Sequence, residues 1–498
     1  MKVYNFLMLL SYFDKLKEKK VIAVVNAFLY SWYYPIFAAV TMVLSNLFGL
    51  ELPVYYLYAL ILAFCVLFTK DLLPALPLTC CGYMTFSEKN NPAHHVYTSY
   101  FNTTAGRVQL FVLVGIVATL LVTRFVFDLI KHPERRKIPA LAFGFLALGI
   151  AYLLGGLFSE YYSGKTVFFG LVQILSLSFF YFLFFYTIEW KEVLHGYFGI
   201  VFTSVALGLV VEVVGMYFDP ALWAEDGTFI RGNLVTGWGL YNNVGGTIAM
   251  CLPAPFYLAV KEKNGWIYNL LGNVVLLGII LTQSRSSILV GGAIYAVCAL
   301  LVLLKTKGRA RISHLIVYGA MLFAVLLCIV ALRDRVVEIF YSIVQIGFDD
   351  NGRFEIYRNG LKQFLDNPFF GNGFYECTAW QLGTGHLGED AFLPPRYHNT
   401  IVQLLASCGI VSLLAYVFHR VQTGILIFRR RTTEKYFIGL CVLALVLASL
   451  LDCHFFNFGP GLLYSCLLIM AEKSTAEEGS AEREDRTEKV TEQENSIQ

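Results

Sequence analysis

The chain has 498 residues, of which 57% are hydrophobic and only 15% are charged, and its mean hydropathy is +0.62. A water-soluble protein of this length could not bury that much apolar surface, so the composition excludes a soluble enzyme and indicates an integral membrane protein. The net charge of +3 assigns no partner, because the orientation of a membrane protein depends on where its basic residues lie.

The chain begins with an apolar run followed by the lysine-rich KLKEKK, which reverses the charge order of a signal peptide. We therefore expect residues 1–20 to lie at the cytoplasmic membrane surface. A membrane-spanning helix needs about 20 apolar residues, and on this basis the sequence predicts an all-α polytopic membrane protein with about fourteen, and no fewer than about twelve, spans. The predicted spans are 21–48, 52–69, 72–86, 107–130, 138–158, 166–188, 194–218, 238–260, 266–282, 286–304, 312–332, 399–419, 436–452 and 454–471.

The basic clusters predict how these helices are oriented. When the short, proline-containing span 72–86 is included, one side of the membrane receives KLKEKK, KHPERRK (131–137), KEK (261–263), KTKGRAR (305–311) and FRRRTTEK (428–435). That side is the cytoplasm under the positive-inside rule. The other side receives 87–106, 219–237 and one large loop of about 333–398. The polar segment 472–498 is expected to be a disordered cytoplasmic tail, so both termini are predicted to be cytoplasmic.

The large loop contains a predicted amphipathic helix, RFEIYRNGLKQFLDN. Phe354, Tyr357, Leu361 and Phe364 follow one another at spacings of three, four and three residues and so form one apolar face. Such a helix is expected to lie on the outer leaflet. Its N-terminus carries Arg353, and the helix dipole and the guanidinium together favour a bound anion there. The alternative is an ordinary interfacial helix with a solvated arginine.

Arg285, in TQSRSS, lies in a predicted external turn between the spans 266–282 and 286–304. It therefore shares a face of the membrane with Arg353 and with His398, where the chain re-enters the membrane. A charged residue within a span costs about 3 kcal/mol and is a functional-site hypothesis by default. The alternatives are an arginine that extends to the lipid headgroups and a histidine that is structural or merely solvated.

Together these stretches resemble the O-antigen ligase and O-antigen polymerase superfamily of bacterial membrane glycosyltransferases. LTQSRSSILVG is similar to its arginine helix–turn–helix motif, and GRFEIYRNGLKQFLDNPFFGNGF to its external arginine helix with the following Pro-x-x-Gly-x-Gly segment. HNTIVQLLASCGIVSLLAY is similar to its histidine–asparagine re-entry motif. YNNVGGTIAMCLP matches a further element, in which Asn243 lies ten residues before Pro253. The resemblance covers about residues 238–420.

The resemblance implies a helical fold of the GT-C type and a division of the chain into domains. The implied domains are N-terminal transmembrane helices (21–235), an O-antigen ligase-like core (236–420) that contains the external loop 333–398, and C-terminal transmembrane helices (421–471). They would lie in the inner, cytoplasmic membrane of a bacterium.

The resemblance also implies an activity, the transfer of a glycan from undecaprenyl diphosphate to an acceptor hydroxyl on the external face. Carried over residue by residue, Arg285 and Arg353 would bind the lipid diphosphate and His398 would be the catalytic base. Three further residues are expected to support the site: Asn243, Arg358 and Asn399. The expected partners are the lipid bilayer and an undecaprenyl-diphosphate-linked oligosaccharide, with a flippase and a chain-length regulator as candidate protein partners and no nucleic acid.

These residue types suit such chemistry. The planar fork of arginine binds phosphate oxygens bidentately, and histidine can accept the proton of an attacking hydroxyl near neutral pH. Attack opposite the leaving group would invert the anomeric centre. We expect no metal and no cofactor, because the first external loop is only GLEL, with Glu51 as its single carboxylate, and Asp349 and Asp350 are adjacent rather than spaced as DxD.

Three functions stay open at this point. A polymerase would join lipid-linked repeat units into a capsule, exopolysaccharide or O-antigen chain. A ligase would move a finished chain onto lipid A core, a protein or a wall polymer. A lipid-linked oligosaccharide flippase would have a similar number of helices, but the large external loop disfavours it. Polymerase is favoured because no additional soluble acceptor-binding domain is predicted after the core.

Overall fold

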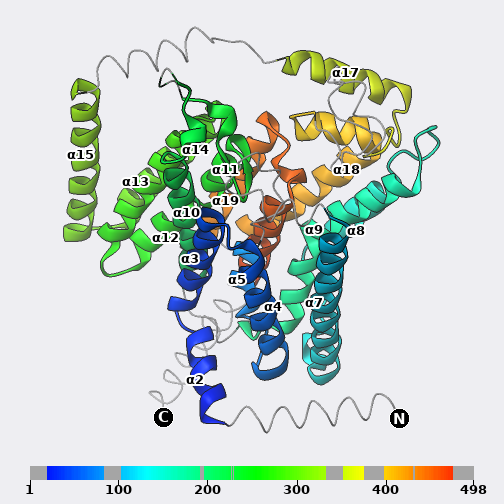
Figure 1. The fold of residues 1–498 in the computed structure, drawn as a ribbon, viewed down its shortest axis with the longest axis horizontal. Helices are drawn as coiled ribbons and strands as arrows, with labels where there is room; N and C mark the ends of the chain where they lie inside the picture. The colour runs from blue at the N-terminus through cyan, green and yellow to red at the C-terminus, as the bar shows by residue number, and fades with distance from the viewer. Residues whose placement is uncertain are drawn as a thin grey trace, which may run out of the picture.

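The computed structural model describes residues 19–82, 103–190, 196–225, 227, 229–331, 352–374, 397–429 and 432–474, and these residues are almost entirely helical (Figure 1). Within them the only sheet is a pair of two-residue antiparallel strands, β1 (Val235–Thr236) and β2 (Gly239–Leu240). The predicted all-α class is confirmed. Most of the predicted segments 1–20, 333–398 and 472–498 lies outside the described residues.

The helices of the described residues follow in chain order. They are α2 (Lys20–Leu29), α3 (Tyr33–Phe48), α4 (Glu51–Phe68), α5 (Ala75–Cys81), α7 (Thr104–Lys131), α8 (Ala142–Leu153), α9 (Gly164–Thr187), α10 (Tyr197–Met216), α11 (Tyr241–Cys251), α12 (Pro253–Lys261), α13 (Gly265–Leu281), α14 (Arg285–Lys305), α15 (Gly308–Ala331), α17 (Arg353–Asp366), α18 (Thr400–Phe428) and α19 (Thr433–Leu451). Residues 458–474 form a last helix. Single 3₁₀ turns are η2 (Pro133–Arg135), η4 (Pro220–Leu222), η5 (Arg231–Asn233) and η6 (His454–Phe456).

Several of these helices can cross a membrane. By length and composition, the described residues contain eight such helices, or nine if α2 and α3, which meet at an angle of 76°, form one broken span. Three further apolar helices are shorter: Leu52–Phe68, Ala142–Leu153 and Gly265–Leu281. The chain is therefore a multi-pass membrane protein. The number of helices that meet these criteria within the described residues is smaller than the predicted number of about fourteen spans. The GT-C arrangement stays a prediction.

Two of the predicted spans are short for physical reasons. In the described part of 72–86 the only helix is α5, whose seven residues rise about 10 Å, a third of the hydrocarbon thickness. In 138–158, α8 ends at Leu153 and the chain turns at Gly156, which has a φ of 83°. The Gly156 N–H donates to the carbonyl oxygen of Phe370 at 2.7 Å, so the segment that follows α17 fixes this turn.

The helix α18 is broken at Gly409, which has a φ of 65° and a ψ of −165°. A Cβ at this position would lie 2.3 Å from the carbonyl oxygen of Phe369, so only glycine allows the approach of the two backbones. Backbone N–H groups of Asn372 and Gly373 donate to carbonyls of α18 at 2.9 and 2.7 Å. The first two turns of α18 are thereby held against the segment after α17, at the end of the bundle that α17 covers (Figure 1).

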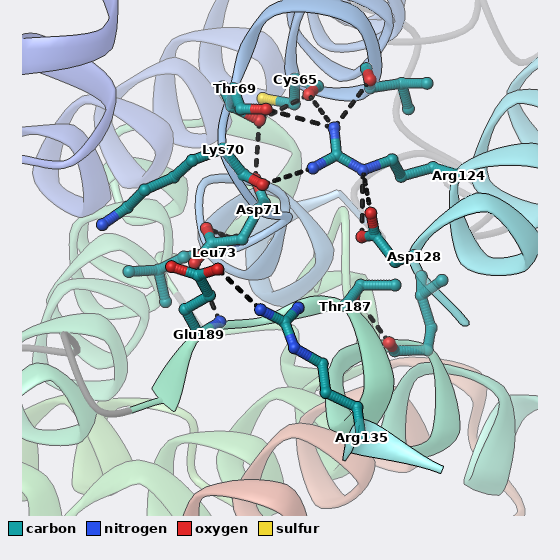
Figure 2. A network of polar contacts seen from close by, with 12 residues as sticks. Cys65, Thr69, Lys70, Asp71, Leu73, Arg124, Asp128, Arg135, Thr187 and Glu189 are labelled. Atoms are coloured by element: carbon teal, nitrogen blue, oxygen red, sulfur yellow. Dashed lines mark hydrogen bonds and ion pairs between the residues drawn. The ribbon is translucent and has the colours of Figure 1, made fainter. Parts of the chain in front are cut away.

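A buried arginine joins the helices at the opposite end of the bundle (Figure 2). The Nε of Arg124, in α7, donates to both carboxylate oxygens of Asp128 at 3.0 Å. Its Nη atoms donate to the carbonyls of Val66, Thr69 and Lys70 at 2.8, 3.2 and 2.6 Å. The guanidinium thus satisfies carbonyl groups that the end of α4 leaves without helical partners.

Candidate active site

His398 lies at the start of α18 in a conformation that non-glycine residues rarely adopt, with a φ of 52°. The next residue, Asn399, caps the helix, since its Oδ1 accepts from the N–H groups of Ile401 and Val402 at 2.8 and 3.1 Å. The cap fixes where α18 begins and therefore where the His398 ring lies. Non-glycine residues held in left-handed backbone conformations cluster at functional sites, because the surrounding structure must offset their strain.

The imidazole of His398 contacts a carboxylate that follows α19. Its Nδ1 lies 3.0 Å from Oδ1 of Asp452. Burial alone would raise the pKa of Asp452, but the hydrogen bond from His398, the nearby imidazole of His454 and the N–H of Cys453 outweigh burial and hold this pKa well below its usual range. Because an ionised carboxylate can only accept a hydrogen bond, His398 must donate from Nδ1, which leaves Nε2 as the acceptor.

The histidine of this pair is accessible, whereas the carboxylate is buried. The side chain of His398 is 41% exposed and that of Asp452 only 9%. Within the described residues, no hydrogen bond engages Nε2 of His398. A buried carboxylate therefore orients a histidine whose remaining nitrogen is accessible, which is an arrangement suited to proton transfer.

The side chain of Arg353, at the start of α17, also contacts the end of α19. Its Nη1 donates to the carbonyl oxygen of Leu451 at 2.9 Å, directly before Asp452. The side-chain amide of Asn399 donates to the preceding carbonyl, that of Leu450, at 2.9 Å. The C-terminus of α19 is thus surrounded by Arg353, His398 and Asn399, which the sequence predicted for the site.

The helix α17 packs on the start of α18 through Ile356 and Tyr357, which contact the buried cluster that includes Val402 and Ala406, and through its small and polar residues. Gly360 and Gln363 are buried, and the Tyr397 hydroxyl donates to the side-chain carbonyl of Gln363. On the predicted apolar face, Phe354 is 73% exposed and Leu361 44% exposed. An exposed apolar stripe is what a helix in contact with lipid would present.

Arg285 is the first residue of α14, at the turn that the sequence predicted. Gln283, with a φ of 53°, directs the chain into this turn, and the Ser284 side chain accepts from the N–H of Ser287 as the N-cap. The Ser284 hydroxyl also donates to Oδ1 of Asn242, in α11, at 2.8 Å. The start of α14 is therefore fixed against the first turn of α11.

Asn243 connects this turn with the segment that follows α19. Its Oδ1 accepts from the side-chain amide of Asn457, five residues after Asp452, at 2.7 Å. The other ends of α14 and α19 also meet, since the ammonium of Lys305 lies 5.2 Å from the ring centroid of Tyr436. The two helices are antiparallel neighbours, and Arg285 is at the same end of the bundle as Asp452.

All six predicted site residues thus lie at one end of the bundle, and five of them form two groups. Arg353, His398 and Asn399 surround the C-terminus of α19, and Arg285 and Asn243 flank the contact of α14 with α11. The sixth, Arg358, is exposed on α17 and has no hydrogen bond or ion pair within the described residues. Asp452 was missed, since a single carboxylate after the apolar run VLALVLASLL carries no local signature of its partner.

These observations define a class, a polytopic helical membrane protein with a histidine–carboxylate pair and arginines gathered at one end. A family model described as O-antigen ligase matches residues 271–417, which include Arg285, Arg353 and His398. The match supports the O-antigen ligase/polymerase superfamily that the sequence motifs predicted, and it covers about the central third of the chain. A search of curated proteins gives no match.

Proposed function

We propose that the protein transfers a glycan from undecaprenyl diphosphate to an acceptor hydroxyl on the external face of a bacterial inner membrane. The observation that carries this proposal is the contact of His398 with Asp452, beside Arg353 and at the same end of the bundle as Arg285. The family match supports a lipid-linked glycan as the substrate.

In the proposed reaction, the acceptor hydroxyl oxygen attacks the anomeric carbon of the donor glycan. The bond between that carbon and the diphosphate oxygen breaks, and undecaprenyl diphosphate leaves with the electron pair. Nε2 of His398 takes the hydroxyl proton, and the ionised Asp452 stabilises the imidazolium that forms. Because attack occurs opposite the leaving group, the anomeric centre is inverted.

Arg285 and Arg353 have the role of binding the diphosphate. Negative charge grows on the leaving group as the anomeric bond breaks, and fixed guanidinium groups stabilise that charge without having to reorganise. Asn243 and Asn399 hold the backbone segments that carry these groups. In this proposal neither a metal ion nor a cofactor takes part, so purified enzyme should stay active in EDTA; loss of activity that Mg²⁺ or Mn²⁺ restores would contradict this.

Among the three open functions we propose a polymerase, with a ligase as the second candidate. A polymerase needs only lipid-linked repeat units, because one unit donates its glycan and another accepts it. A ligase needs a separate acceptor such as lipid A core. Purified protein supplied with lipid-linked repeat units alone should produce longer lipid-linked chains. Product that forms only after lipid A core or another acceptor is added would identify a ligase, and movement of intact lipid-linked units without transfer would identify a flippase.

The test of the catalytic assignment is His398→Ala in the same transfer assay. This variant should insert into the membrane normally and lose transfer. The matched control is His132→Ala at the opposite end of the bundle, whose imidazole contacts Glu134 on the protein surface. Normal transfer by His398→Ala would overturn the assignment, and loss of transfer in both variants would indicate a defect in folding.

A further inference from the structure

The segment between α10 and β1 folds onto the turn that carries Arg285. The Tyr217 hydroxyl donates to the carbonyl oxygen of Leu281, at the end of α13, at 2.6 Å. The Tyr217 ring stacks on Phe229 with 4.9 Å between centroids. Within the segment, the side-chain amide of Asn233 donates to the carbonyl of Ala221 at 2.6 Å. The segment is therefore anchored on the α13–α14 turn by contacts that involve no charge.

This segment places a further guanidinium at the same turn. The Cζ of Arg231, in η5, lies 4.7 Å from the ring centroid of Tyr241, the first residue of α11. Its Nη1 donates to the carbonyl oxygen of Gln283 at 3.5 Å, which is at the limit for a hydrogen bond. Gln283 is two residues before Arg285, so Arg231 contacts the backbone of the turn that carries Arg285.

The contact with Tyr241 is a cation–π interaction, which suits a guanidinium, but neither contact is an ion pair. The anchor of the segment is Tyr217, whose hydrogen bond to the same turn is much shorter. Arg231 is partly exposed, and within the described residues it forms no ion pair. Within the described residues, its guanidinium, which has five N–H donors, donates one weak hydrogen bond, so donors remain for a further acceptor.

We propose that Arg231 binds the diphosphate of the lipid-linked donor as a third guanidinium, in addition to Arg285 and Arg353. This inference rests on the proposed function, because it requires a diphosphate at the Arg285 turn. A diphosphate has two phosphoryl groups with separate sets of oxygens, and one planar guanidinium binds one such set bidentately. The contact with the Tyr241 ring restricts the Arg231 side chain, and a restricted side chain loses less entropy on binding.

An additional cation at the site should contribute more to binding of a diphosphate, which has a second phosphoryl group, than to binding of a monophosphate, and that difference provides the test. The experiment measures inhibition of glycan transfer by undecaprenyl diphosphate and by undecaprenyl phosphate, for the wild type and for Arg231→Gln. In the variant, the inhibition constant for the diphosphate should rise about tenfold or more, which is the loss of one charge-assisted contact, while that for the monophosphate should change little. The inhibition constant of Arg231→Lys for the diphosphate should lie between those of the wild type and of Arg231→Gln.

The controls separate binding from a structural role of the segment. Tyr217→Phe removes the anchor on Leu281 and Asn233→Ala removes an internal hydrogen bond, and both should keep the preference for diphosphate. An equal rise of both inhibition constants in Arg231→Gln, no change in either, or a wild type that does not prefer the diphosphate would overturn the inference. Absence of glycan transfer in the wild type would instead overturn the proposed function.

Discussion

His398 and Asp452 are 54 residues apart in the sequence, yet the imidazole Nδ1 and the carboxylate Oδ1 lie 3.0 Å apart. Hydrogen bonds between the starts of α17 and α18 and the end of α19 hold the two residues together. Asn399 caps the start of α18 and donates to the last turn of α19, and Arg353, at the start of α17, donates to the carbonyl beside it. The carbonyls of Leu450 and Leu451, at the end of α19, therefore accept hydrogen bonds from side chains at the starts of α17 and α18.

The first prediction concerns Asp452→Asn. An asparagine amide can donate to Nδ1 of His398, which favours the tautomer with its proton on Nε2 and removes the base. We expect the rate of glycan transfer to fall about a hundredfold or more, the range for a lost general base, with little change in the binding of the donor. The control is Asp366→Asn, which removes an exposed carboxylate at the end of α17. Full activity of Asp452→Asn would show that the carboxylate does not set the tautomer.

The same carboxylate predicts a pH dependence of stability. The pKa of Asp452 is lowered in the folded protein, so its contribution to stability is present above the ordinary aspartate pKa of about 3.9 and is lost as the pH falls through the folded value. The melting temperature of the wild type in detergent should therefore exceed that of Asp452→Asn most at neutral pH. The difference should shrink as the pH falls below about 4; a difference that stays constant down to pH of about 3 would contradict the prediction.

The sequence predicted the helical class and the grouping of Arg285, Arg353 and His398, because both depend on long apolar runs and on the alternation of basic clusters. It did not predict the number of long helices. The broken helix α18 and the short helix α8 result from backbone contacts of Gly409 and Gly156 with the segment that follows α17. Such contacts are not encoded in the hydropathy of either partner.

Asp452 and Arg231 could not be identified from the sequence for a related reason. Each is a single charged residue beside an apolar element, which is the common position of a solvated side chain. The distinguishing fact for Asp452 is the distance to His398, and for Arg231 it is the stacking on Tyr241 next to Gln283. Both facts depend on helices that meet only in the folded protein.

The orientation of the protein in the membrane can be tested with two exposed positions. Glu225, in the segment before β1, and Lys307, in the turn between α14 and α15, are both exposed. Nine of the eleven cysteines are buried, so a background with the other two, Cys328 and Cys377, replaced by serine should react little with thiol reagents. In intact cells Glu225→Cys should react with an impermeant reagent and Lys307→Cys only after permeabilisation. The reverse pattern would place the candidate site on the cytoplasmic side.

Two ion pairs at the opposite end of the bundle should differ in their effect on stability. Arg124 and Asp128 are only 5% and 3% exposed, so Asp128→Asn leaves a buried guanidinium without its counter-charge. We expect a loss of about 3–5 kcal/mol in the free energy of unfolding. Arg135 and Glu189 are 17% and 31% exposed, so Glu189→Gln should cost about 1 kcal/mol or less. Unfolding by titrated denaturing detergent measures both, and equal losses would contradict the role of burial.

The last prediction concerns Arg285, for which two explanations compete. If Arg285 only extends to the lipid headgroups, any long cationic side chain will serve, and lysine supplies one. If it binds the diphosphate, lysine keeps the charge but loses the planar fork. The N-cap of α14 is the side chain of Ser284, so Arg285→Lys leaves the turn intact and should fold normally.

The two explanations therefore predict different rates for Arg285→Lys in transfer from an undecaprenyl diphosphate glycan. Loss of one charge-assisted contact costs about 1.5–3 kcal/mol, so a diphosphate site should lose about ten- to a hundredfold in rate. The matched control is Arg309→Lys, the same substitution at an exposed arginine near the start of α15, which should leave the rate unchanged. Both variants are compared with the wild type at equal expression. A near-normal rate in Arg285→Lys would mean that Arg285 is a surface anchor, because the bidentate geometry would then have no role in transfer.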